Sequence, residues 1–321
     1  MCGFLGEVSF TNKVSERSKF IHSSKLLSHR GPDNFDYFSD KKNIQLGFNR
    51  LSIFDVSANG NQPMRSKSGR FIIVFNGAIY NFKHIYNNIK NQFDWKSKSD
   101  TEVLLNAWSK WGPECLSRLE GMFSFAIWDN ELKKIFLCRD RIGEKPLYYF
   151  NQESYIAFSS RPKPLVKLLP ELLGEYNFSS IKYFLESGHF PRSESFYLNI
   201  KKLEPGNYIE FSKDKIKKKS YWNLQNLNTE VNNHDLNSNI NQLENLLIKN
   251  IKKMVQSDRP LGFFLSGGID SSLAVSIASK VNPTDKIKAF NLSFDNSKYD
   301  ESEDAKIVAK KNNIDLEIKK L

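Results

Sequence analysis

The second residue of the chain, Cys2, could act as a nucleophile without a catalytic histidine. Removal of the initiator Met1 would leave Cys2 at the N-terminus, with a free α-amine beside its thiol. An α-amine has a pKa of about 8, so it can accept the thiol proton near neutral pH and activate the sulfur for attack on a carbonyl carbon. Taken alone, Met-Cys-Gly also fits an ordinary second residue, so other motifs must decide.

Two sites in the first half offer groups that a thiolate attacking an amide would need. Asn76-Gly77 follows the apolar run 71–75 and supplies a side-chain amide and a backbone N–H, which are suitable donors to a tetrahedral oxyanion. Asn-Gly is also the commonest hairpin signal, so a plain turn is the alternative. Arg50 carries a planar guanidinium that suits a bidentate grip on a carboxylate.

A glycine-rich turn in the second half is typical of phosphate binding. The apolar residues 263–265 lead into Ser266-Gly267-Gly268-Ile269-Asp270-Ser271, which opens a helix. Backbone N–H groups in such a turn can bind pyrophosphate, and Asp270 could help to position Mg²⁺ on a nucleotide. Neither a Walker nor a dinucleotide-binding motif occurs in the chain, and a plain strand–turn–helix junction is the alternative.

The elements that must position these residues differ between the two halves. Up to about residue 150, short apolar runs alternate with turn residues, which indicates an α+β arrangement. Apolar residues at helical spacing behind Ser99 predict a helix over 100–111. In the second half an α/β pattern predicts strands at 262–265, 287–294 and 314–318, with helices at 271–280 and 302–312.

A polar, asparagine-rich stretch predicts the domain boundary. We expect a first domain over 2–213, a linker over 214–238 and an incomplete second domain over 239–321. Lysines gather at 213–219, behind a strand-like run. A solvated hairpin edge protected by lysines is the preferred interpretation, and a nucleic-acid patch is the alternative.

Composition restricts the class of protein. The 321 residues are 40% hydrophobic and 26% charged, with a net charge of +11, which excludes disordered, collagen-like and disulfide-scaffold proteins. Cys115 and Cys138 are expected to be core residues, and no metal site is predicted. The sequence has no secretory signal and no apolar run of membrane-spanning length, so a cytoplasmic protein without membrane or nucleic-acid partners is expected.

Taken together and in this order, the motifs resemble those of glutamine-dependent asparagine synthetases. The resemblance spans essentially the whole chain. Its motifs lie at residues 1–3, 29–33, 50–53, 76–77, 119–126, 139–149, 203–206, 266–272 and 299–301. It implies an N-terminal-nucleophile αββα sandwich followed by part of an α/β domain similar to PP-loop ATP pyrophosphatases.

The resemblance also implies a ligase that forms C–N bonds. Cys2 would hydrolyse glutamine with its α-amine as base, and Asn76 and Gly77 would form the oxyanion hole. Arg50 would hold the glutamine carboxylate, and Asp100 the ammonium. The implied glutamine site comprises Arg50, Leu51, Ser52, Ile53, Phe54, Ala78 and Asp100. The implied ATP site comprises Leu265, Ser266, Gly267, Gly268, Asp270, Ser271 and Leu292.

In that family the ammonia passes to an aspartate activated by ATP and Mg²⁺, and the glutaminase reaction needs no cofactor. Glutamine, ATP and aspartate are therefore the expected substrates, and a homodimer is expected from the resemblance alone. An amidotransferase for another carboxylate, such as a polysaccharide sugar acid, is one alternative. A catalytically silent basic binding protein is another, because the net charge is +11.

The chain departs from the family pattern at two positions. Ala78 stands where the family usually has a glutamate that helps to bind the ammonium, which predicts weaker glutamine binding. Arg161 stands where an acidic residue is common, and we assign it no role. The chain also stops at Leu321, before the family's acceptor residues, so we expect it to hydrolyse glutamine but not to make asparagine.

Overall fold

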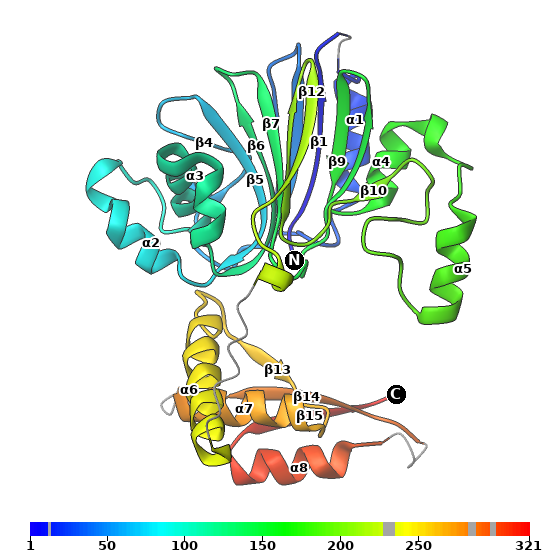
Figure 1. Ribbon diagram of the computed structural model, residues 1–321. Helices are drawn as coiled ribbons and strands as arrows, with labels where there is room; N and C mark the ends of the chain where they lie inside the picture. Colours follow the sequence, from blue (N-terminus) through cyan, green and yellow to red (C-terminus); the bar gives the residue numbers. More distant parts are fainter. Residues whose placement is uncertain (12–13, 227–234, 282–286, 296–299) are drawn as a thin grey trace. The chain divides into compact units, whose positions relative to one another are not determined.

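A computed structural model describes residues 1–11, 14–226, 235–281, 287–295 and 300–321 (Figure 1). Residues 227–234 of the predicted linker, and Tyr299 of the last motif, lie outside the described residues. The chain folds as two compact units, residues 1–228 and residues 229–321. No helix in the described part of the chain is both long and apolar enough to span a membrane.

The first unit contains two six-stranded sheets in which neighbouring strands pair antiparallel. The first sheet has the order β10-β8-β9-β1-β3-β2. Its strands are β1 (Gly3–Ser9), β2 (Asn34–Ser39), β3 (Ile44–Arg50), β8 (Tyr148–Gln152), β9 (Tyr155–Ser159) and β10 (Lys201–Lys202). The second has the order β12-β11-β7-β6-β5-β4. Its strands are β4 (Met64–Arg65), β5 (Phe71–Ile79), β6 (Gly121–Asp129), β7 (Lys134–Arg139), β11 (Asn207–Ser212) and β12 (Lys215–Ser220).

Helices cover the outer faces of the two sheets (Figure 1). Helices α1 (Arg17–Lys25) and α4 (Pro162–Leu168) pack on the first sheet. Helices α2 (Phe82–Ile89) and α3 (Asp100–Trp111) pack on the second sheet. Helix α5 (Phe178–Ser187) follows in the chain. This arrangement confirms the predicted αββα sandwich.

Strand β5 shows how alternation along one strand builds two of the cores. Ile72 and Val74 lie in the core between the two sheets, whereas Ile73 and Phe75 lie in the core under α2 and α3. Successive side chains of a strand point to opposite faces, so one strand of apolar residues serves both layers. A third core, between the first sheet and α1 and α4, includes Phe20 and Leu165.

The Asn76-Gly77 pair lies within β5, not in a turn. Asn76 pairs with Ser124 and Gly77 with Phe123 of β6, and β5 continues to Ile79. The hairpin-turn alternative is therefore wrong. The partner strand, which is contributed by residues far along the chain, overrides the local turn signal of the dipeptide.

The lysine-rich segment forms the outer strand of the second sheet. Strand β12 pairs with β11, and its residues are exposed along its whole length, which confirms the predicted hairpin edge. The sheet thus extends to Ser220, past the boundary predicted at residue 213. Helix α6 (Leu236–Met254) also begins inside the predicted linker range.

The second unit is a small parallel α/β assembly, as predicted. Strands β13 (Gly262–Phe264), β14 (Lys288–Ser293) and β15 (Asp315–Lys320) pair in this order. They alternate with α7 (Ile269–Val281) and α8 (Ser302–Lys311). The apolar core of this unit includes Leu265, Val275, Ala289 and Ala305.

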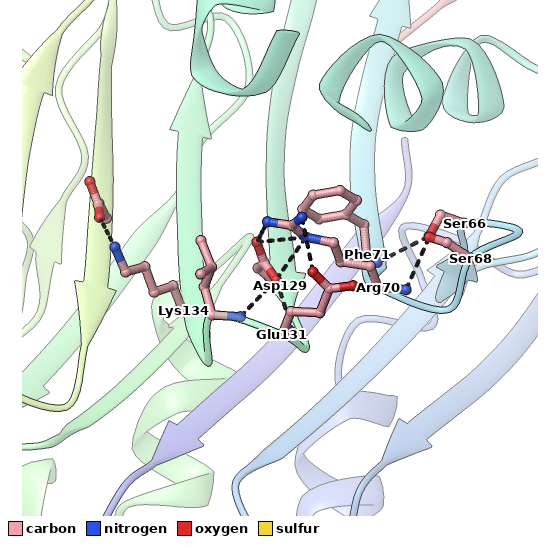
Figure 2. A network of polar contacts seen from close by, with 9 residues as sticks. Ser66, Ser68, Arg70, Phe71, Asp129, Glu131 and Lys134 are labelled. Atoms are coloured by element: carbon pink, nitrogen blue, oxygen red, sulfur yellow. Dashed lines mark hydrogen bonds and ion pairs between the residues drawn. The ribbon is translucent and has the colours of Figure 1, made fainter. Parts of the chain in front are cut away.

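A polar network fastens the end of β6 that carries Asp129. Figure 2 shows Arg70 reaching the carboxylates of Asp129 and Glu131. Asp129 is almost fully buried and also accepts the backbone N–H groups of Glu131 and Leu132, both at 3.0 Å. A buried carboxylate with several donors is costly to disturb, because each donor loses its acceptor.

We expect Asp129→Asn to lower the free energy of unfolding by about 2–3 kcal/mol, because the amide cannot accept all of these donors. Urea unfolding measures the change. Glu131→Gln is the matched control, since Glu131 is 63% exposed and exposed ion pairs contribute at most about 1 kcal/mol. Equal losses in the two variants would contradict this ranking.

Candidate active site

The pairing of β1 with β3 brings Cys2 to the segment that follows Arg50. Gly3 pairs with Asn49, so Cys2 lies beside the start of the next loop. The Leu51 N–H donates to Sγ of Cys2 at 3.3 Å, and the sulfur lies 3.5 Å from the Leu51 carbonyl oxygen. Cys2 is partly buried at this junction.

The surroundings keep the Cys2 thiol protonated. Burial raises the pKa of Cys2, and the charge of Asp100 adds to this effect. The Leu51 hydrogen bond, the N-terminal amine and the Arg50 guanidinium act in the opposite direction. A thiol with a raised pKa needs a base to take its proton at neutral pH before it can act as a nucleophile.

Asn76 presents a buried donor that has no partner. Its side chain is 1% exposed, and among the described residues Nδ2 finds no acceptor. Asn76 lies on the same face of β5 as Val74, which faces the first sheet. Strand β1 of that sheet begins at Gly3, directly after Cys2. An unsatisfied buried amide costs free energy in the folded state. It is best explained as a hydrogen-bond donor to a bound ligand.

Ser124 is a polar residue of this region that the sequence analysis missed. It lies directly opposite Asn76 on β6 and is fully buried. Its Oγ also lacks a partner within the described ranges. Only the register of β5 against β6 reveals it, because nothing in the local sequence marks Ser124.

Gly77 is required by the close approach of β6. A Cβ atom at this position would lie 2.1 Å from the Met122 carbonyl oxygen and 2.8 Å from the Cα of Phe123. No side chain fits there without displacing the backbone of the neighbouring strand. The glycine thus has a packing reason, independent of the predicted oxyanion role, which stays a prediction.

Arg50 anchors the loop that follows it. Its Nη1 donates to the Ser57 carbonyl oxygen and to Oδ1 of Asn61, each at 2.7 Å. Its Nη2 donates to the carbonyl oxygens of Phe54 and Asp55. A bidentate grip on a carboxylate would require Arg50 to exchange at least one of these acceptors. Arg50 therefore has a structural role in the loop beside its predicted role in binding the glutamine carboxylate.

The predicted pocket residues 51–54 have different environments. The Ser52 N–H donates to the Asp33 carboxylate at 2.8 Å, which ties this segment to the motif at residues 29–33. Phe54 packs against Phe82, with ring centroids 5.3 Å apart. Ile53 is 40% exposed, so it is the residue of this segment that is freest to contact a ligand.

Asp100 connects α3 to the end of β5. It is the first residue of the helix, behind the Ser99 N-cap, and its Oδ2 accepts the Ile79 N–H at 3.0 Å. The side chain is 4% exposed, and burial raises its pKa to about 7. Ala78, the preceding residue of β5, is also buried. Asp100 and Ala78 are thus neighbours at one edge of the site.

Basic side chains also lie near Cys2 and the motif at residues 29–33. The Nε of Arg30 donates to the Cys2 carbonyl oxygen at 3.0 Å. Nε2 of His29 lies 3.0 Å from Nη1 of Arg161. Arg161 thus lies next to the motif at residues 29–33, a contact that no local sequence pattern predicts.

The second unit has its own candidate site at the carboxyl ends of β13 and β14. A cavity of about 210 Å³ is lined by Leu265, Ser266 and Leu292, all predicted ATP-site residues, and by Asn291. Nδ2 of Asn291 donates to the Leu265 carbonyl oxygen at 2.8 Å, and its Oδ1 has no partner in the described part of the chain. Ligands of open α/β sheets bind at this edge.

The predicted phosphate loop adjoins this cavity. Oγ of Ser271 lies 3.0 Å from Oγ of Ser266, which closes the turn. Gly267 has a φ of +94°, and a Cβ there would lie 2.7 Å from the Glu301 carbonyl oxygen. Gly268 and the exposed Asp270 complete the turn and the start of α7. These features fit a nucleotide. Among the described residues no cluster of acidic, histidine or cysteine side chains could hold a metal ion.

Residues 1–222 match the family model for the glutamine amidotransferase domain. The chain belongs to the glutamine amidotransferase family. Residues 242–320 match the model of the asparagine synthase family. The asparagine synthetase resemblance proposed from the motifs is thereby confirmed.

Proteins similar to this chain include two asparagine synthetases of Bacillus subtilis. Glutamine-hydrolysing asparagine synthetase 1 is 31% identical over 96% of the chain, and synthetase 2 is 33% identical over 87%. The chain spans only 48% and 39% of the lengths of these two proteins.

A solved structure shares the fold. The glutamine phosphoribosylpyrophosphate amidotransferase of B. subtilis superposes with a TM-score of 0.50 at 14% identity, covering 99% of this chain and 81% of that one. At this identity the likeness supports the fold alone.

Proposed function

We propose that the chain hydrolyses glutamine to glutamate and ammonia, with Cys2 as the N-terminal nucleophile. The observation that carries this proposal is the unpartnered, buried Nδ2 of Asn76 on the face of the second sheet that packs against the first. It supplies what a thiolate attacking an amide requires, a preorganised donor for the developing oxyanion. The amidotransferase family of residues 1–222 supports the same reaction.

The reaction proceeds in two halves. After removal of Met1, the Cys2 α-amine takes the thiol proton, Sγ bonds to the amide carbon of glutamine, and the carbonyl electron pair moves to oxygen. The amine then gives its proton to the leaving nitrogen, the C–N bond breaks, and ammonia departs from the thioester. Water hydrolyses the thioester, which releases glutamate and restores the thiol.

We assign the other site residues accordingly. Asn76 and Gly77 stabilise the oxyanion, Arg50 and the segment 51–54 bind the substrate backbone, and Asp100 pairs with the ammonium. Burial of Asp100 beside Ala78 supports this assignment, because a buried carboxylate gains from binding a cation.

We further propose that residues 239–321 form the first part of a nucleotide-binding domain, separated from the glutaminase domain by the linker. Leu265, Leu292 and the loop 266–271 would hold ATP, with Asp270 near its Mg²⁺. ATP would activate an acceptor carboxylate by adenylation. Since two relatives are named asparagine synthetases, aspartate is the acceptor we propose for the whole protein.

Release of ammonia and glutamate from glutamine by the purified chain tests the proposed function. Intact mass establishes whether Met1 has been removed. We expect equimolar ammonia and glutamate from chains that begin at Cys2. A folded chain that begins at Cys2 and releases neither product would contradict the proposal.

Restoring the family's glutamate should strengthen glutamine binding. We expect Ala78→Glu to lower the glutamine KM by about 10- to 100-fold, because a second carboxylate would face the ammonium beside Asp100. Ala78→Gln, of the same shape without the charge, is the matched control and should change KM much less. A wild-type KM no higher than that of Ala78→Glu would refute this role of Ala78.

Glutamine binding should weaken in acid through Asp100. Because the pKa of Asp100 is about 7, its carboxylate becomes protonated below that pH and loses its attraction for an ammonium. We expect the glutamine KM to rise about tenfold from pH 8 to pH 6. Asp100→Asn should show a high KM that varies little over this range. A wild-type KM that is flat from pH 8 to pH 6 would exclude Asp100 as the ammonium partner.

A further inference from the structure

Lys145 carries a buried ammonium group whose partner is unusually weak. The residue is 6% exposed, and Nζ lies 3.3 Å from Sδ of Met1. Across the described ranges, this thioether is the sole hydrogen-bond partner of Nζ. Thioether sulfur is a poor acceptor, and buried lysines are normally paired with better ones. The position of Lys145 therefore needs another explanation than the contact with Met1.

Many hydrogen bonds hold the loop that carries Lys145. The Asp140 carboxylate is fully buried and accepts the backbone N–H groups of Phe123, Ile142, Gly143, Glu144 and Lys145. Arg139 donates from Nε to the Lys145 carbonyl oxygen at 2.9 Å and from Nη2 to that of Gly143 at 2.6 Å. These bonds fix the backbone from which the lysine reaches the N-terminus.

A second cation approaches the N-terminus from another element. Arg30 donates to the Cys2 carbonyl oxygen, and its Nη2 lies 3.9 Å from Sδ of Met1. The Met1 side chain thus lies between two positive charges. Removal of Met1 would take away the thioether and make the α-amine of Cys2 the new N-terminus, at the residue whose carbonyl oxygen Arg30 contacts and next to the residue that Lys145 contacts.

The groups that face the N-terminal amine act in both directions. Burial lowers the pKa of the α-amine of Met1, and so do the charges of Arg30 and Lys145. The Cys2 thiol and Asp33 act in the opposite direction. Arg30 also holds the Cys2 backbone, whereas Lys145 contributes chiefly its charge. Burial and the charge of Arg30 lower the pKa of Lys145 itself, and the carboxylates of Glu144 and Asp140 act in the opposite direction.

We propose that Lys145 is a positioning residue that keeps the α-amine of processed Cys2 unprotonated near neutral pH, by holding a fixed positive charge beside it. This inference rests on the proposed glutaminase function. A neighbouring cation disfavours protonation of an amine, and only the unprotonated amine can take the thiol proton. Lys145 thus acts through Cys2 and does not need to touch the substrate.

The pH dependence of kcat at saturating glutamine tests this role in chains that begin at Cys2. Asp100 does not obscure the result, because its carboxylate is paired with the substrate ammonium in the saturated complex. We expect Lys145→Met to move the acid limb of kcat up by about one pH unit, which is about a two- to fivefold loss at pH 7 and about a tenfold loss at pH values well below the limb. At pH 9 kcat should recover to within about twofold of wild type, with little change in KM.

Three further variants make the test decisive. Lys145→Arg keeps the charge and should restore the wild-type profile. Lys145→Gln removes the charge with a polar side chain and should repeat the shift if Lys145→Met fails to fold. Lys167→Met makes the same substitution at an exposed position of α4 and should leave the profile unchanged.

The outcomes separate the inference from the proposed function. No ammonia release by wild type would refute the glutaminase function itself. If wild type is active and Lys145→Met and Lys145→Gln have the same acid limb of kcat as wild type, the proposed role of Lys145 is wrong. A loss of kcat that is equal at pH 7 and pH 9, without rescue by arginine, would also overturn it, because it would indicate a merely structural role.

Discussion

Cys2→Ala is expected to abolish glutamine hydrolysis, with a fall in kcat of about 10⁴-fold or more. Alanine removes the atom that forms the thioester, and no other described group near Leu51 and Arg50 is a thiol. The small residue should still permit removal of Met1, so the N-terminal amine is kept. Ammonia release, followed with a coupled assay, measures the loss.

The two core cysteines provide the matched controls for this variant. Cys115 and Cys138 are fully buried, and burial raises the pKa of each thiol. Their thiolates are therefore scarce, and we expect Cys115→Ala and Cys138→Ala to keep kcat within about threefold of wild type. If Cys2→Ala kept a tenth of the wild-type rate, Cys2 would not be the nucleophile.

Asn76→Ala is expected to lower kcat by about 10²- to 10³-fold, with a smaller change in KM. The Nδ2 donor would be lost only where charge develops, on the oxygen of the tetrahedral intermediate, so the loss falls on the chemical step. Steady-state kinetics separate the two constants. Asn76→Asp, of the same shape but without the donor, should lose a similar factor.

Stability should respond to Asn76→Ala quite differently from activity. Because Nδ2 has no partner among the described residues, its removal breaks no hydrogen bond of the folded chain and relieves an unsatisfied buried group. We expect the free energy of unfolding to stay the same or rise by up to about 1 kcal/mol. For activity, a kcat of Asn76→Ala within about threefold of that of wild type would exclude Asn76 from the oxyanion hole.

Local signals in the sequence predicted several elements well. The helix predicted over 100–111 is α3, because Ser99 caps it and the apolar residues repeat at helical spacing. The lysine-rich edge strand and the alternation of strands and helices after residue 262 were also evident, since edge protection and periodicity depend on neighbouring residues.

Features that depend on distant partners were beyond the sequence. The Asn76-Gly77 pair reads as a turn until β6 is placed beside it, and Ser124 becomes visible only through that register. The loop acceptors of Arg50 required its backbone path. Lys145 and Met1 are 144 residues apart in the sequence, so no local pattern encodes their contact.

Alkylation by a diazomethyl ketone analogue of glutamine tests whether Cys2 is the nucleophile of a glutamine site. The thiolate displaces dinitrogen from a group that is bound where the amide of glutamine would lie. We expect a single adduct, mapped by tandem mass spectrometry to Cys2 of chains that lack Met1 and prevented by excess glutamine. An adduct on Cys115 or Cys138, an adduct that glutamine does not prevent, or no adduct on a folded chain beginning at Cys2 would contradict it.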